Sequence, residues 1–264
     1  MPHAFHNIRR STISHAAPDA NQDATASSAI AIAVADGITA KNGAMIVEGR
    51  PVGRLIATAV AERAVGSLQT GRALADVLTD EARAVCERLG ISSHSQPDTA
   101  PGCVVACAHI MVDKLVVTMV GDVGVRINGE MLIQSPATVD ELTSTARAHY
   151  IALTGDIAGS RAFILPLLLA QSAYSNNSDH PLGFGVVTDT ATPDKFVTVT
   201  EFDASSVETI ELFTDGYPAI PDETSIEAWE AAYAAAVAAD PHRCGEFKAT
   251  KTKDDRTVLI ADVT

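Results

Sequence analysis

The stretch IAIAVADGIT, residues 30–39, is a short apolar segment of the kind that forms a buried β-strand, and it stops at an Asp-Gly pair. A second stretch, IELFTDGYP at residues 210–218, has the same form. An aspartate at the end of a strand lies at the rim of a sheet, and the glycine after it lets the backbone turn sharply. The two stretches therefore predict two rigid strands that each present a carboxylate at the edge of a sheet.

Helix and strand patterns come in groups around these two stretches. Residues 51–68, 71–89 and 225–239 have the apolar period of helices, and the short link between the first two predicts an antiparallel helix pair. Residues 103–131 predict two or three strands joined by turns. This grouping differs from the regular strand-helix alternation of a parallel sheet. We therefore expect an α+β fold, a four-layer αββα sandwich of two antiparallel sheets flanked by helix pairs.

Residues 137–181 interrupt this pattern. They combine a helix-like segment, residues 138–150, with glycine-containing and polar stretches, and we expect an irregular insertion there. No linker or internal repeat divides the chain, and 264 residues fit one large domain. The sequence therefore predicts a single domain over residues 1–264, with a flap-like insertion around residues 137–181.

The composition excludes several classes of partner. The formal net charge is −14, whereas binding to nucleic acid or to an anionic membrane needs clustered Lys and Arg. No apolar segment reaches the roughly 18 residues that cross a bilayer, and the N-terminal residues lack the apolar core of a signal peptide. The four cysteines form no C-x-x-C pair, which indicates buried free thiols. We expect a soluble, cytoplasmic protein that binds neither nucleic acid nor membranes.

Four aspartates stand where a predicted strand ends, begins or turns: Asp36, Asp122, Asp215 and Asp254. Carboxylates brought together repel each other unless a cation neutralises them. A site made only of oxygen ligands favours Mg²⁺ or Mn²⁺. At any single Asp-Gly pair, ordinary turn chemistry explains the residues better than metal binding does. The hypothesis of a metal site therefore depends on the whole set of aspartates.

Five short motifs, in order along nearly the whole chain, resemble those of the metal-dependent protein phosphatases, called PPM or type 2C, and of their bacterial branch in particular. The motifs are SHAAPDANQDA (14–24), AVADGIT (33–39), VVTMVGDVGVRI (116–127), LFTDGY (212–217) and KDDRTVLI (253–260). Each motif is short, and their common order makes the resemblance specific. The fold of that family, an αββα sandwich, agrees with the fold expected from the pattern.

The resemblance implies a role for each matching residue. The implied metal-binding residues are Asp36, Gly37, Asp215, Asp254, Asp122 and Asp23. Asp36 would hold two ions, Asp23 would act through a water, and Asp122 would bind a third, weaker ion. Asp255 stands where many members of the family have asparagine. The implied catalytic residues are Asp36, Asp215, Asp254 and His15.

The resemblance also implies an activity, the hydrolysis of phosphoserine or phosphothreonine in a protein such as a cognate kinase or its target. A water activated by two Mn²⁺ or Mg²⁺ ions would attack phosphorus directly. The sequence departs from the family at Thr39, where a second glycine is usual, and at Val123, where serine is usual. His15 is the candidate to bind the phosphate in place of an arginine, although an ordinary polar histidine explains it equally well. Arg161 belongs to the predicted flap.

Two alternatives compete with this hypothesis. A phosphatase of the haloacid-dehalogenase type needs a nucleophilic aspartate two residues before the Asp-Gly pair, but those positions hold Val34 and Phe213. The second alternative is a phosphatase-like module that has lost catalytic activity and serves in regulation or binding. The retained acids favour the enzyme, whereas Thr39 and the unassigned phosphate ligand favour the module.

Overall fold

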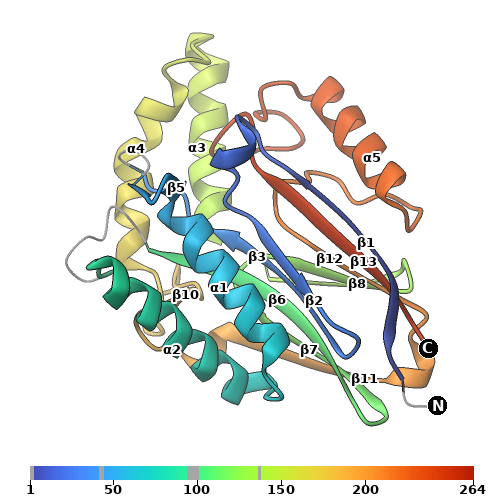
Figure 1. Cartoon of the computed structure of the whole chain (residues 1–264). Coiled ribbons are helices and arrows are strands. Elements are labelled where there is room, and N and C mark those ends of the chain that lie inside the picture. The colour runs from blue at the N-terminus through green and yellow to red at the C-terminus, as the bar shows by residue number, and fades with distance from the viewer. Residues whose placement is uncertain (1–2, 42–44, 94–100, 136–137) are drawn as a thin grey trace.

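Two antiparallel sheets form the centre of the computed structural model (Figure 1), which describes residues 3–41, 45–93, 101–135 and 138–264. The strands of sheet A are β1 (Phe5–Ile13), β8 (Gly124–Ile127), β9 (Met131–Gln134), β12 (Thr209–Phe213) and β13 (Arg256–Val263). The strands of sheet B are β2 (Ala24–Ser27), β3 (Ala31–Gly37), β6 (Gly102–Met111), β7 (Lys114–Val120), β10 (Val187–Thr188) and β11 (Val197–Asp203). Sheet A has the order β1-β13-β12-β8-β9 and sheet B the order β11-β7-β6-β3-β2, with β10 paired to β6.

Strand β3 shows why the apolar segments of the sequence form this architecture. Its alternate side chains enter two separate cores, since successive residues of a strand point to opposite faces. Ile32 and Val34 lie in the core between the two sheets, whereas Ala33 and Ala35 lie in the core beneath the helices. A strand that is buried on both faces must be apolar throughout, which explains the unbroken apolar run before Asp36.

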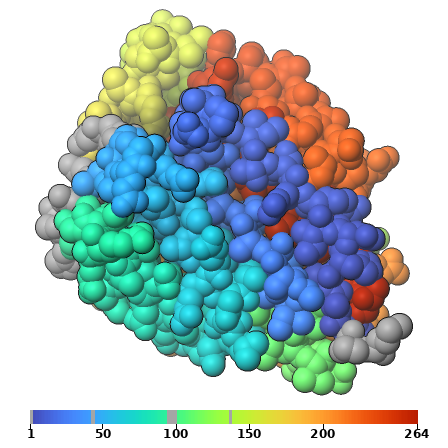
Figure 2. Space-filling view, viewed as in Figure 1, coloured from blue at the N-terminus to red at the C-terminus, as the bar shows by residue number. Residues whose placement is uncertain are grey.

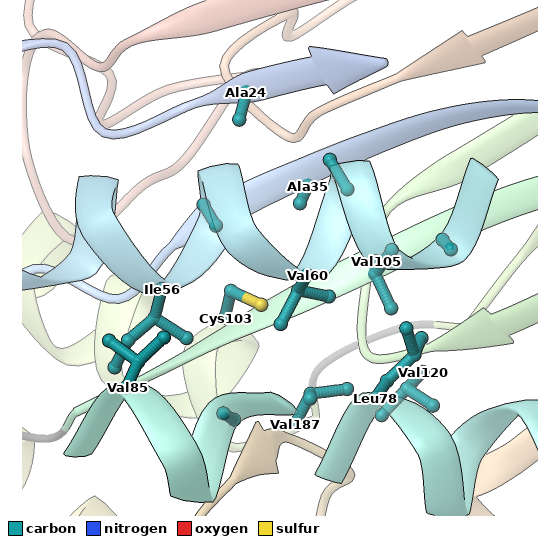
Figure 3. Close-up of a cluster of buried hydrophobic side chains, with 14 of the residues drawn as sticks. Ala24, Ala35, Ile56, Val60, Leu78, Val85, Cys103, Val105, Val120 and Val187 are labelled. Carbon is teal, nitrogen blue, oxygen red and sulfur yellow. The ribbon is translucent and has the colours of Figure 1, made fainter. Parts of the chain in front are cut away.

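Helices cover the outer faces of both sheets. They are α1 (Val52–Gly66) and α2 (Gly71–Leu89) on sheet B and α5 (Ile226–Ala239) on sheet A, whereas α3 (Thr138–Thr154) and α4 (Ser160–Ala170) contact each other. Short strands β4 (Ile46–Val47) and β5 (Arg50–Pro51) pair just before α1. Side chains such as Ile56, Val60 and Leu78 pack α1 and α2 onto sheet B (Figure 3). Trp229 of α5 packs on Phe213 of sheet A, with ring centroids 4.7 Å apart. The predicted αββα sandwich is confirmed.

Two further expectations concern the thiols and the helices. Cys86, Cys103 and Cys107 are buried and free, as the cysteine pattern predicts, whereas Cys244 is free but only half-buried. Over the described ranges, no helix has both the length and the apolar character needed to cross a membrane.

Helices α3 and α4 pack against each other at one end of the molecule (Figures 1 and 2). Most of this region is therefore regular, whereas the sequence predicts an irregular insertion after residue 150. Burial of Ile164 and Leu168, together with the stacking of Tyr150 on Phe163 at 4.5 Å, stabilises α4 despite the proline inside it. The assignment of residues 1–264 to one domain, with a flap in this region, stays a prediction.

Candidate functional site

The ends of strands from both sheets meet at one side of the sandwich. β12 and β13 are antiparallel neighbours, so the segment that follows β12 and the segment that precedes β13 share one edge of sheet A. Asp215 lies two residues after the end of β12, and Asp254 lies two residues before the start of β13. Asp36 lies at the end of β3 in sheet B, and Asp122 lies in the link that carries the chain from β7 in sheet B to β8 in sheet A.

These strand ends line a cavity of about 1040 Å³. The predicted metal-binding residues that line it are Asp36, Gly37, Asp122, Asp215 and Asp254. Residues that are distant in the sequence thus line one cavity. Asp23 and His15 are not among the residues that line the cavity. Asp23 is fully buried behind it, where its charge interacts with that of Asp254.

Burial and repulsion from neighbouring carboxylates raise the pKa of three carboxyl groups in this cluster, those of Asp36, Asp122 and Asp215. Burial, followed by the charges of Asp23 and Asp215, raises the pKa of Asp36 well above its ordinary value. Burial and the charge of Asp254 raise the pKa of Asp215 to about 6, and burial and the charge of Asp215 raise the pKa of Asp122 to about 8. In each case too little positive charge lies nearby to stabilise the ionised carboxylate. The cluster therefore has the electrostatic character of a site for cations.

Asp23 carries a more specific sign of a missing partner. Its Oδ2 accepts a hydrogen bond of 3.0 Å from the Thr214 hydroxyl, but its buried Oδ1 has no partner among the described residues. An unpartnered buried carboxylate oxygen is costly unless a water or an ion satisfies it. Asp23 thus fits the role that the resemblance implies, in which it contacts a metal through water.

His15 lies beside Asp255 instead of the cavity. Its Nδ1 is 2.7 Å from Oδ1 of Asp255, and the same buried carboxylate accepts hydrogen bonds from the backbone N–H groups of His15 and Gln22. Burial alone would raise the pKa of Asp255, but these hydrogen bonds hold it below its ordinary value. This arrangement ties the N-terminal motif to the start of β13. It favours a positioning role for His15.

Thr39, the departure from the family pattern, has a structural partner. Its hydroxyl accepts a hydrogen bond of 2.9 Å from the side-chain amide of Gln22. This bond joins the loop after β3 to the N-terminal motif. The neighbouring Gly37 is constrained more tightly, because a Cβ there would lie 2.4 Å from backbone atoms of Gly53 at the start of α1. The backbone that would offer the Gly37 carbonyl is therefore held against α1.

Solved structures share this architecture. The catalytic domain of the serine/threonine protein phosphatase PstP, solved with two manganese ions, is 16% identical to the chain, and the match covers 99% of each chain with a TM-score of 0.52. The Mycobacterium tuberculosis serine/threonine phosphatase PstP/Ppp is 17% identical over 98% of each chain, with a TM-score of 0.51. The chain has the serine/threonine phosphatase fold. No protein-family model and no curated protein sequence matches it.

The phosphatase fold of this chain contains charged residues in the cavity that sequence analysis missed. Lys251 lies in the loop before β13, and its Nζ is 2.5 Å from Oδ1 of Asp254. Asp140 of α3 faces Asp122 and Asp215, whose pKa values its charge raises. Lys41 also lines the cavity, and burial lowers its pKa. None of these residues follows a buried strand, so the strand-end pattern gives no reason to select them.

The donors of this site suit a hard divalent cation, since they are carboxylates and a backbone carbonyl. Within the ranges that the structure describes, however, no three His, Cys, Asp or Glu side chains already surround one point as a metal shell. Lys251 lies against Asp254 in that neighbourhood. A metal would therefore bind with a rearrangement of this ion pair.

A buried arginine holds the loop that carries Lys251 and Asp254. The guanidinium of Arg147, in α3, donates hydrogen bonds of 3.0–3.1 Å to the carbonyl oxygens of His242, Arg243 and Ala249. It also donates to the Thr252 hydroxyl at 3.0 Å. Arg161, the residue assigned to the flap, lines the cavity and donates to the Thr250 carbonyl at 2.8 Å. Helices α3 and α4 are thus bonded directly to the loop before β13.

Gly216 gives a test of how tightly the strand ends are packed. A Cβ at this position would lie 1.8 Å from the carbonyl oxygen of Asp255. We expect Gly216→Ala to separate the ends of β12 and β13 and to lower the free energy of unfolding by about 2 kcal/mol or more. Urea denaturation of the metal-free protein measures this loss. Gly66→Ala is the matched control, because no atom lies within 4 Å of a Cβ at Gly66; equal stability of the two variants would contradict the prediction.

Proposed function

We propose that this protein is a metal-dependent phosphatase that hydrolyses phosphoserine or phosphothreonine in proteins. The observation that carries the proposal is the meeting of Asp36, Asp215 and Asp254, from three different strands, at one cavity. The fold supports it, since PstP shares the architecture and was solved with two manganese ions. The substrate would be a phosphorylated protein, such as a cognate kinase or its target, and the location would be the cytoplasm.

Mn²⁺ or Mg²⁺ would be held by the cluster of strand-end oxygens. Asp36 would bind two ions, and the Gly37 carbonyl would bind one of these two. Asp215 and Asp254 would supply the remaining protein ligands of the pair of ions. Asp122 would bind a third ion, beside Asp140, and Asp23 would hold a metal-bound water through its unpartnered oxygen. When bound, the ions supply a water that is deprotonated near neutral pH and positive charge for the phosphoryl oxygens.

The protein's own side chains would orient the substrate. Lys41 and Arg161 line the cavity and supply positive charge on the side of α4. Such charges offset the negative charge of a phosphoryl group as the bond to the leaving oxygen breaks. His15 remains the phosphate-binding candidate from the sequence, and its contact with Asp255 favours an indirect contribution.

A turnover assay separates the enzyme from an inactive binding module. Protein stripped with EDTA is assayed on p-nitrophenyl phosphate and on a phosphothreonine peptide before and after addition of Mn²⁺. We expect no turnover without metal, turnover with Mn²⁺, and loss of that turnover in Asp215→Asn. Binding of Mn²⁺ without turnover of either substrate would favour the regulatory or binding module.

A further inference from the structure

Lys251 is placed among the carboxylates of the proposed metal site. Its side chain lines the same cavity, is 25% exposed, and brings Nζ to 2.5 Å from Oδ1 of Asp254. The same Oδ1 also accepts the backbone N–H of Asp255 at 2.9 Å. A carboxylate oxygen has two lone pairs, so this oxygen already has its full set of partners.

The positive charge of Lys251 also acts on the neighbouring acids. Besides its contact with Asp254, the Lys251 ammonium interacts electrostatically with Asp36 and Asp215. One ammonium therefore faces three carboxylates. It offsets part of their repulsion and leaves an excess of negative charge for further cations.

We propose that Lys251 is a built-in counter-ion of the carboxylate cluster, and that a divalent metal ion displaces its ammonium from Asp254 when it binds. The inference rests on the proposed metal site. A metal ion and an ammonium at the same carboxylate repel each other strongly in a buried site. Lys251 would therefore hold the acids together without metal and weaken the binding of metal. The site would then bind and release ions in response to their concentration.

The first test compares metal binding and stability in Lys251→Met, which keeps an unbranched apolar chain and removes the charge. We expect calorimetric titration to show that this variant binds Mn²⁺ about tenfold more tightly than the wild type, because the repulsion is gone. In EDTA, we expect its midpoint of thermal unfolding to be lower than that of the wild type. Lys253→Met is the matched control, since Lys253 is exposed in the same loop, and it should change neither quantity.

A second measurement uses the wild-type protein and needs no variant. Amines are acetylated with N-hydroxysuccinimidyl acetate, and the labelled lysines are counted by mass spectrometry with and without saturating Mn²⁺. We expect Lys251 to be labelled several-fold faster with Mn²⁺, because its ammonium leaves Asp254, while Lys253 is labelled equally in both samples.

The outcomes distinguish this inference from the proposed function. If Lys251→Met binds Mn²⁺ as the wild type does, or less tightly, or if labelling of Lys251 does not respond to Mn²⁺, the lysine is not displaced and only this inference fails. If neither protein binds Mn²⁺, the metal site itself is wrong and the proposed function fails with it. If only the variant binds, the metal does not displace the lysine in the wild type, and both this inference and the proposed function of the natural chain fail.

Discussion

We expect Asp36→Asn to lower the manganese-dependent rate of p-nitrophenyl phosphate hydrolysis by about 1,000-fold or more, which corresponds to about 4 kcal/mol of transition-state stabilisation. Asparagine preserves the shape of the side chain but removes the charge that would bind two ions. Steady-state kinetics over a range of Mn²⁺ concentrations measure the loss, and calorimetric titration measures the accompanying loss of metal binding. Excess Mn²⁺ should not restore the rate.

The same variant separates a catalytic defect from a folding defect. Burial and the charges of Asp23 and Asp215 disfavour the ionised form of Asp36, so a neutral asparagine relieves repulsion in the metal-free protein. We therefore expect the thermal midpoint of Asp36→Asn in EDTA to equal or exceed that of the wild type. Asp222→Asn is the control, because Asp222 is exposed, and it should keep full activity. Retention of a tenth or more of the wild-type rate in Asp36→Asn would contradict the assignment.

Glu211→Ala is expected to cost the largest part of the stability of sheet A, about 3–5 kcal/mol, because it leaves a buried arginine without its partner. Glu211 is fully buried and accepts hydrogen bonds from Nη2 of Arg126 at 2.7 Å and from Nε1 of Trp229 at 2.8 Å. Both donors lose their acceptor in this variant. Urea denaturation monitored by the fluorescence of Trp229, the single tryptophan, measures the change.

The matched control for this prediction is an exposed ion pair. Lys114 and Glu201 pair between β7 and β11, with side chains 61% and 52% exposed. Exposed pairs are screened by water and contribute about 1 kcal/mol or less. Glu201→Ala should therefore change the free energy of unfolding far less than Glu211→Ala does. Similar losses in the two variants would show that burial of the Arg126 pair contributes little.

The central strands and the site aspartates could be predicted because one pattern specifies both. A strand buried on both faces leaves a long apolar run, and the first charged residue after it marks the rim of the sheet. Asp36 and Asp215 were found in this way, and the short strands and turns around Asp122 and Asp254 placed the other two. The packing of the sheets then brings these ends to one cavity.

The remaining charges of the site could not be predicted, because their positions depend on tertiary contacts. Lys251 lies in a loop without periodicity, and Asp140 lies in the first turn of α3, where an acid is common for reasons of helix electrostatics. The glycine-containing and polar stretches around α4 predict irregular structure, whereas packing against α3 stabilises the helix. His15 was predicted to face a phosphate, and its contact with Asp255 requires knowledge of where β13 begins.

The hydrogen bonds of Arg147 have a mechanical consequence. The guanidinium of Arg147 donates hydrogen bonds to three carbonyl groups of the segment before β13. A tilt of α3 would therefore also move Lys251 and Asp254. The two helices and this acidic wall then move as a unit. Residues 183–186 also line the cavity, and they are held by pairing with residues 174–176 instead of by Arg147. Substitutions in residues 183–186 should thus alter which proteins are accepted while leaving small-molecule turnover intact.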